Sequence, residues 1–172
     1  MSLEIDPFKN IKLSQVWVET KSRLMIVDDE VFNIFALKGL MRVLGCEMEE
    51  RIDVCYNGEQ AVDLIRKAIR EGDVDRYSLI LTDCSMPFMD GYEASKLIRL
   101  LIKEARNEEE VDKLKIVAIT GHVEPEYILK AHRSGINKVF PKPVPILELG
   151  TILCDLKFIQ SIPTRLQRQN TE

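Results

Sequence analysis

The stretch YSLILTDCSMP, residues 77–87, sets the pattern from which the fold can be predicted. It opens with a continuous apolar run, which is typical of a strand buried on both faces of a parallel sheet. The run ends on Asp83, and Pro87 cannot continue a central strand because it lacks the backbone donor. A buried strand that stops at a carboxylate places that charge at the edge of the sheet.

The same arrangement of an apolar strand followed by a helix occurs five times along the chain. The predicted strand segments cover residues 23–30, 51–56, 77–83, 115–120 and 138–143, and the predicted helices cover residues 31–44, 59–70, a stretch ending near 106, 125–134 and 145–159. Such a succession predicts an α/β fold with a parallel sheet. We expect a flavodoxin-like, doubly wound sheet in the order 2-1-3-4-5, with helices on both faces.

The predicted apolar face of the first helix is defined by residues at helical spacing. These residues are Val31, Ile34, Phe35, Leu37, Met41 and Leu44. The fourth helix, residues 125–134, has few apolar anchors, mainly Ile128 and Ala131. A weakly anchored helix suits an element that shifts between two states.

Composition limits the classes of protein to which the chain can belong. It has 172 residues and a formal net charge of -4, so nothing favours nucleic acid or an anionic membrane as a partner. No apolar run approaches the roughly 20 residues of a membrane span, and the start lacks a secretory signal pattern. The four cysteines form no CxxC pair, which argues against zinc and for reduced thiols in the cytoplasm.

The expected domain organisation has three parts. Residues 1–22 form a linker or N-terminal extension, residues 23–160 form the folded domain, and residues 161–172 form a flexible tail. The charged run at residues 107–114 is expected to be a solvated connection.

Polar residues follow the ends of four predicted strands. Asp28 and Asp29 end the first strand, Asp83 the third, Thr120 the fourth and Lys142 the fifth. Ligands of open α/β sheets bind at this edge, close to the point where the strand order reverses. Two carboxylates 4 Å apart repel each other by roughly 4 kcal/mol at an effective dielectric constant near 20. A hard cation such as Mg²⁺ would offset this repulsion, and Lys142 adds a fixed positive charge.

Together these groups form a set suited to phosphate. Mg²⁺, an ammonium group, a hydroxyl and backbone N–H groups all stabilise phosphoryl oxygens. A carboxylate within such a set can itself accept the phosphoryl group.

Four motifs at these strand ends resemble those of the receiver domains of two-component response regulators. The motifs are VDDE (27–30), TDCSMPFMDGYEA (82–94), AITGH (118–122) and FPKP (140–143). The resemblance extends over about residues 23–159, and the pattern is most similar to receivers of hybrid histidine kinases and phosphorelays. It implies that the chain is a phosphoacceptor signalling domain rather than a turnover enzyme. The chain is either a stand-alone receiver or a segment of a larger kinase, and residues 5–21, which look like an upstream connection, favour the segment.

The resemblance also implies a metal site. Asp83 would be the phosphoacceptor, and Asp29 and Asp83 would bind Mg²⁺ directly. The backbone carbonyl of Ser85 would complete the protein ligands, and Asp28 would hold the water shell of the ion.

A switch is implied by the same family pattern. Thr120 would bind a phosphoryl oxygen, and Lys142 would pair first with Asp83 and then with the phosphoryl group. Phe140 corresponds to the aromatic residue that changes rotamer on activation, although simple core packing explains it equally well. The family also implies a cis peptide bond between Lys142 and Pro143.

The phosphoryl donor is expected to lie outside this chain. His122 and His132 are the two histidines, and neither lies in a sequence that resembles a kinase phosphoacceptor helix. The expected partner is therefore a histidine kinase or a histidine phosphotransfer protein. His122 is either a surface loop residue or, with Ser85, a flank of the phosphoryl group. Gly121, where the family usually has Ala, leaves the placement of His122 open.

Two other functions remain open at this point. A phosphatase of the haloacid dehalogenase type also uses an Asp nucleophile, a hydroxyl, a Lys and Mg²⁺, but its D-x-D motif would need an acid at position 85, where this chain has Ser85. A pseudo-receiver that only binds a partner is the second alternative, and the complete set of key residues argues against it.

Overall fold

The computed structural model describes residues 22–106 and 113–168. The predicted connection at 107–114 and the predicted N-terminal extension therefore lie largely outside the described residues. Within the described residues, the strands are β1 (Arg23–Val27), β2 (Ile52–Cys55), β3 (Tyr77–Thr82), β4 (Lys115–Thr120) and β5 (Lys138–Pro141). The helices are α1 (Val31–Val43), α2 (Gly58–Arg70), α3 (Gly91–Ala105), α4 (Pro125–Arg133), α5 (Ile146–Asp155), α6 (Thr164–Gln167) and the short 3₁₀ helix η1 (Glu49–Arg51).

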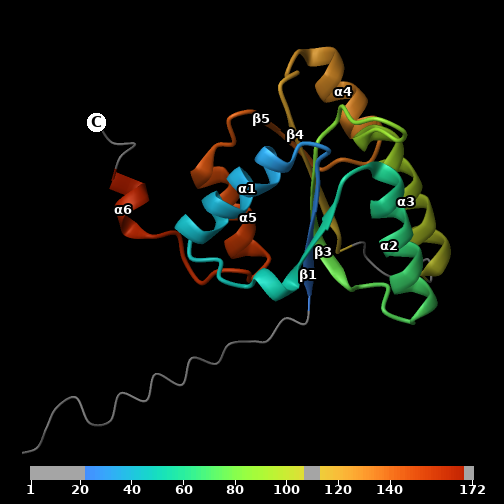
Figure 1. The fold of residues 1–172 in the computed structure, drawn as a ribbon, viewed down its shortest axis with the longest axis horizontal. Coiled ribbons are helices and arrows are strands. Elements are labelled where there is room, and N and C mark those ends of the chain that lie inside the picture. Colours follow the sequence, from blue (N-terminus) through green and yellow to red (C-terminus); the bar gives the residue numbers. More distant parts are fainter. Residues whose placement is uncertain (1–21, 107–112, 169–172) are drawn as a thin grey trace, which may run out of the picture.

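The five strands form one parallel sheet in the order β2-β1-β3-β4-β5, as predicted. The order reverses between β1 and β3, so the ends of these two strands are neighbours although Thr82 comes 55 positions after Val27 in the sequence. Helices α1 and α5 cover one face of the sheet, and α2 and α3 cover the other (Figure 1).

Alternation along the strands divides the core into two layers, because successive side chains of a strand point to opposite faces. Met25, Ile80 and Ile116 belong to the layer under α2, α3 and α4. Their neighbours, Ile26, Leu81 and Val117, belong to the layer under α1 and α5. Helices cover the sheet on both faces, so β1, β3 and β4 are buried on both sides, which explains why these strands consist of continuous apolar runs.

The starts of α2 and α3 are fixed by side-chain caps. The Asn57 side chain accepts a hydrogen bond from the Gln60 N–H at 2.9 Å, and the Asp90 side chain accepts one from the Glu93 N–H at 2.8 Å. These contacts satisfy backbone donors that the first turn of a helix leaves without partners. Both caps lie at the carboxyl edge of the sheet, so they hold this edge in place.

Helix α1 differs from its predicted apolar face. Ile34, Leu37 and Met41 are buried, but Val31 and Phe35 are 49% and 68% exposed. The helix turns Ile34 and Leu37 onto the sheet, and Val31 and Phe35 are left exposed within the part of the chain that the structure describes. Phe32, which lay outside the predicted face, is 86% exposed.

The segment after α5 contributes to the core, and α6 within the predicted tail was not predicted. Phe158 and Ile159 are buried in the layer under α1 and α5, and Ile162 packs against it. A Cβ atom added to Gly150 in α5 would lie 2.9 Å from both Ile162 and Leu44, so a glycine lets these segments approach. None of the described helices is both long and apolar enough to cross a bilayer.

A charged cluster ties the edge strand β2 to the centre of the sheet. The Arg23 guanidinium donates two hydrogen bonds to the Asp53 carboxylate, at 2.6 and 2.8 Å, and the Tyr77 hydroxyl donates a third at 2.8 Å. The pKa of Asp53 is held below its ordinary value, mainly by the hydrogen bond from Arg23, while burial acts in the opposite direction.

Replacing Asp53 by Asn should lower the free energy of unfolding by about 1–3 kcal/mol at pH 7, because hydrogen bonds to a charged partner are lost. The lowered pKa means that this stabilisation is present above the unfolded-state pKa of about 3.9 and disappears as the pH falls through the folded-state pKa. Urea denaturation at pH 7 and at pH 3 measures both effects, and the difference between the two proteins should shrink at the lower pH.

Asp63→Asn is the matched control, since Asp63 forms an exposed ion pair with Arg66 at 3.1 Å. Exposed pairs contribute little, so this variant should change stability by less than about 0.5 kcal/mol. Equal effects of the two substitutions at pH 7 would contradict the role assigned to Asp53.

Candidate functional site

The candidate site lies where the carboxyl ends of β1 and β3 meet. The Asp83 N–H donates to the Val27 carbonyl at 2.8 Å, and the Asp28 N–H donates to the Cys55 carbonyl at 3.1 Å. These bonds extend the sheet by one residue and bring Asp28 and Asp83 to the same edge. Both aspartates are buried, at 6% and 8% exposure.

Three carboxylates converge at this edge. One oxygen from each of Asp28, Asp29 and Asp83 lies within 4.8 Å of the others. Oxygen atoms of this number and spacing fit Mg²⁺, which commonly binds one or two carboxylates and completes its shell with water. The structure therefore brings together the three acids that the sequence analysis assigned to the metal.

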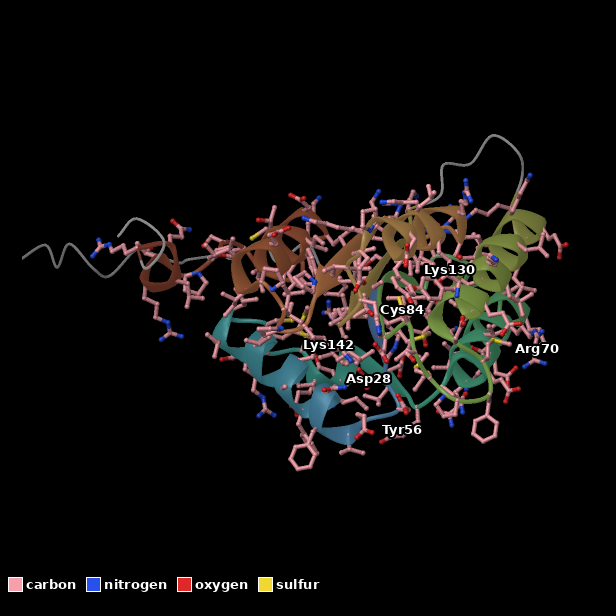
Figure 2. The ribbon with its side chains drawn as sticks, turned by 90° about the horizontal axis from the view of Figure 1, so that it is seen from above. Asp28, Tyr56, Arg70, Cys84, Lys130 and Lys142 are labelled. Carbon is pink, nitrogen blue, oxygen red and sulfur yellow. The ribbon has the colours of Figure 1, made fainter. Side chains whose placement is uncertain are left out.

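Lys142 places an ammonium group between two of these acids. Its Nζ lies 3.2 Å from Asp28 Oδ2 and 3.1 Å from Asp83 Oδ1. The backbone fixes its position, since the Lys142 N–H donates to the Thr120 carbonyl at 2.9 Å, and the Lys142–Pro143 bond is cis, as predicted. In the view onto this edge, Asp28 and Lys142 lie side by side next to α1 (Figure 2).

Burial and charge act in opposite directions on the Asp83 carboxyl. Burial is the largest influence and raises the pKa of Asp83, whereas Lys142 lowers it and Asp28 raises it further. Burial by itself lowers the pKa of Lys142, but Asp83 and Asp28 together outweigh it, so this pKa lies above its ordinary value. The Lys142 ammonium therefore stays charged. It neutralises the Asp83 carboxylate only in part, so a further cation would stabilise the ionised form of Asp83.

Donors from the start of α1 fix the other oxygen of Asp28. Asp28 Oδ1 accepts from the Glu30 N–H at 2.9 Å and from Asn33 Nδ2 at 3.0 Å. Asn33 is absent from the predicted site. The sequence gives only a weak signal for Asn33. An Asn in the first turn of an amphipathic helix is common at exposed positions, so the residue type does not by itself indicate a functional site.

The loop between β3 and α3 is held against the acceptor by a close backbone approach. A Cβ atom added to Gly91 would lie 2.1 Å from the Asp83 carbonyl oxygen, which no side chain can occupy. Within the same loop, the Ser85 N–H donates to Asp83 Oδ2 at 3.3 Å, so Ser85 approaches the acceptor with its backbone. Cys84 is buried, and burial raises the pKa of its thiol to about 11, which leaves it protonated and unreactive.

Thr120 and Phe140 lie on the neighbouring strands β4 and β5. Thr120 is buried, and its hydroxyl oxygen accepts from the His122 N–H at 3.1 Å. Phe140 is fully buried in the layer under α1 and α5, with Lys138 Nζ 4.9 Å from its ring centroid. His122 is exposed, and its ring lies 5.0 Å from that of Tyr127 in α4. The structure therefore places Phe140 in the core and His122 on the surface.

A cavity of about 250 Å³ opens beside the carboxylates. Asp28, Asn33, Asp83 and Lys142 form its polar part, and apolar residues of α1, of the sheet and of the segment after β5 form the rest. A concave site with a few convergent polar groups is the usual form of a small-ligand site.

A family model for the response regulator receiver domain matches residues 24–153. The chain belongs to this family. Hybrid signal transduction histidine kinase C of Dictyostelium discoideum is 34% identical over 126 residues, which are 71% of this chain and 9% of that protein. The chain thus spans less than a tenth of the length of this relative.

Solved receiver structures agree with the fold. The receiver domain of the histidine kinase CKI1 from Arabidopsis thaliana, complexed with Mg²⁺ and BeF₃⁻, is 25% identical with a TM-score of 0.64, covering 79% of this chain and 89% of that one. The receiver domain of Ssk1 from Saccharomyces cerevisiae, co-crystallised with the histidine phosphotransfer protein Ypd1, is 25% identical with a TM-score of 0.63, covering 82% and 92%.

The receiver loop after β3 depends on glycine at position 91. Gly91→Ala should lower the free energy of unfolding by about 1–3 kcal/mol, because the added methyl group overlaps the Asp83 carbonyl and the loop must shift. Gly39→Ala in α1 is the control, since nothing lies within 4 Å of its added Cβ, and it should stabilise the helix by about 0.5–1 kcal/mol. Urea denaturation of both variants gives the comparison. A stability of Gly91→Ala equal to that of the wild type would refute the close approach.

Proposed function

We propose that this receiver domain accepts a phosphoryl group on Asp83, from a histidine kinase or a histidine phosphotransfer protein, with Mg²⁺ as cofactor. The observation that carries the proposal is the position of Lys142 Nζ, 3.1 Å from Asp83 Oδ1 and 3.2 Å from Asp28 Oδ2 at the acidic edge. Such a site combines a buried carboxylate with an ammonium group and two further acids. The receiver of CKI1, with Mg²⁺ and BeF₃⁻ in its structure, supports the same assignment by similarity.

The proposed reaction is a displacement at phosphorus. A carboxylate oxygen of Asp83 attacks the phosphorus atom, the P–N bond to the donor imidazole breaks, and its electron pair stays on the ring nitrogen. The product is an acyl phosphate. The protein contributes positioning and charge neutralisation, which account for most of the catalysis in phosphoryl transfer.

Each member of the site has a proposed task. Asp28, Asp29, Asp83 and the Ser85 carbonyl would hold Mg²⁺, which would neutralise charge on the phosphoryl oxygens. Lys142 would pair with the phosphoryl group through its ammonium. The buried Thr120 hydroxyl, whose oxygen accepts from the His122 N–H, would donate its own hydrogen to a phosphoryl oxygen.

The output of the switch is proposed to involve α4. Ala131 is the one residue that the structure buries within this helix, so the helix is weakly held. Movement of Thr120 toward the phosphoryl group would leave space that Phe140 could enter from the core. The acyl phosphate would thereby shift the population of α4 positions.

The partner surface is proposed to be the aromatic patch on α1, formed by Phe32 and Phe35, with Phe88 of the loop after β3 as a further exposed phenyl group. These side chains are 86%, 68% and 85% exposed, which is unusual for phenyl groups. Phe32 and Phe35 lie one turn apart on α1, and Phe88 lies in the loop after the acceptor strand. Exposed aromatic residues next to a functional site mark a protein interface, and the complex of Ypd1 with the Ssk1 receiver makes a phosphotransfer protein the natural occupant.

The wider context follows from the relatives and stays a proposal. A segment of a hybrid histidine kinase that acts in the cytoplasm fits the similarity to hybrid signal transduction histidine kinase C. The match to the receiver family leaves no support for the haloacid dehalogenase alternative. The pseudo-receiver alternative predicts that the wild-type chain accepts no phosphate, so phosphorylation by acetyl phosphate tests it.

Asp83→Asn should abolish phosphorylation, since an amide cannot form an acyl phosphate. The wild-type chain is incubated with acetyl phosphate and Mg²⁺, and the bound phosphate is detected as an acid-stable, base- and hydroxylamine-labile adduct by intact-protein mass spectrometry. Asp63→Asn, an exposed acid on α2, should be labelled like the wild type. Labelling retained in Asp83→Asn would exclude this residue as the acceptor, and an unlabelled wild type would favour the pseudo-receiver.

The double variant Phe32→Ala, Phe35→Ala should slow transfer from a phosphotransfer protein by about tenfold or more, because aromatic residues dominate the energy of such interfaces. The donor is any phosphotransfer protein that phosphorylates the wild-type chain. Labelling by acetyl phosphate should stay within twofold of wild type, since this small donor needs no docking.

Leu100→Ala, which removes an exposed apolar side chain from α3, is the matched control and should leave both rates unchanged. If transfer from the phosphotransfer protein also stayed unchanged in the double variant, the aromatic patch would not be the docking surface.

A further inference from the structure

Asn33 makes a contact that the proposed reaction does not use. It lies in the first turn of α1, and its Nδ2 donates to Asp28 Oδ1 at 3.0 Å. The adjacent residues fix its direction, since Ile34 is buried in the core and Phe32 is exposed. Asn33 also forms part of the wall of the cavity beside the acids. Its carboxamide is therefore directed at the site by the packing of α1.

The two oxygens of Asp28 are divided between two groups of donors. Oδ1 accepts from Asn33 Nδ2 and from the Glu30 N–H, both at the start of α1. Oδ2 lies 3.2 Å from Lys142 Nζ, and the same ammonium lies 3.1 Å from Asp83 Oδ1. Two donors on one oxygen hold the carboxylate in one orientation. The second oxygen is thereby kept toward the ammonium group and the metal site.

The chemistry of the Asn33 side chain suits this task. A carboxamide donates a hydrogen bond without adding charge to an edge that already has three carboxylates. An acid at position 33 could not donate to Asp28 when ionised, and it would add a fourth negative charge. A leucine has nearly the same size and suits the apolar part of the cavity, but it offers no donor.

We propose that Asn33 is a positioning residue of the magnesium site, which orients Asp28 through its Oδ1 atom so that Oδ2 faces the cation. The inference rests on the proposed Mg²⁺ binding of this receiver. Outer partners of metal ligands usually contribute about 10–100-fold to metal affinity. Asp28 is expected to hold the ion through its water shell, so the lower end of this range applies.

The test is a Mg²⁺ titration of the unphosphorylated chain, followed by amide chemical shifts in ¹H–¹⁵N NMR spectra. Asn33→Leu should raise the dissociation constant for Mg²⁺ by about tenfold. Thermal unfolding in EDTA should stay within a few degrees of wild type, because leucine replaces the volume of the lost side chain. The phosphorylation rate with acetyl phosphate should need more Mg²⁺ for half-saturation but reach a similar maximum.

Two variants separate positioning from general damage to α1. Lys38→Ala, on the same helix, should bind Mg²⁺ like the wild type. Asn33→Gln keeps a carboxamide donor and should recover part of the affinity that Asn33→Leu loses. If Asn33→Leu does not fold, Asn33→Ala takes its place in the titration, with the same expected tenfold loss.

The outcomes distinguish the inference from the proposed function. A wild-type chain that binds no Mg²⁺ would overturn the proposed metal site and this inference with it. A wild-type chain that binds Mg²⁺, together with an Asn33→Leu variant whose dissociation constant stays within twofold, would overturn the role of Asn33 alone. Equal losses in Asn33→Leu and Lys38→Ala would also overturn it, since the effect would then come from α1 as a whole.

Discussion

The ammonium group of Lys142, held between the carboxylates of Asp28 and Asp83, is the interaction on which the site depends. Without a cation, three acids at one edge of a sheet would repel each other and favour protonation of a buried carboxylate. The ammonium offsets part of this repulsion, and the raised pKa of Asp83 shows that burial still outweighs it. Negative charge that Lys142 does not neutralise makes the site suitable for a divalent cation and for the reaction proposed at Asp83.

The rest of the fold keeps these charges at fixed positions. The register between β1 and β3 places Asp28 and Asp83 side by side, Gly91 allows the following helix to begin against the Asp83 carbonyl, and the Thr120 carbonyl holds the backbone of Lys142. By contrast, α4 is weakly anchored, with Ala131 as its buried residue. A rigid charged corner next to a loosely held helix is the combination that lets a local change of charge alter a surface at some distance.

The strands and the edge that carries the site could be predicted from local pattern, whereas the strand order was expected from the flavodoxin-like fold. The apolar runs that become β1, β3 and β4 identify strands buried on both faces, and a polar residue at the end of each one identifies the edge that carries the site. The roles of Asp28, Asp29, Asp83 and Lys142 came from motifs that resemble the receiver family, and the structure brings these four side chains together.

The alternation of strands and helices and the acids that end the strands could be predicted from the sequence, since hydrophobic period and turn residues act over a few neighbouring positions. The sheet order was expected from the flavodoxin-like fold. Packing between distant segments sets which helix faces stay uncovered and which polar side chains meet. Phe35 fitted the helical period of a buried face but is exposed, because α1 packs on the sheet with Ile34, Leu37 and Met41 instead. Asn33 has no distinguishing sequence signal, and its contact with Asp28 exists because the buried Ile34 sets the rotation of α1 against the sheet.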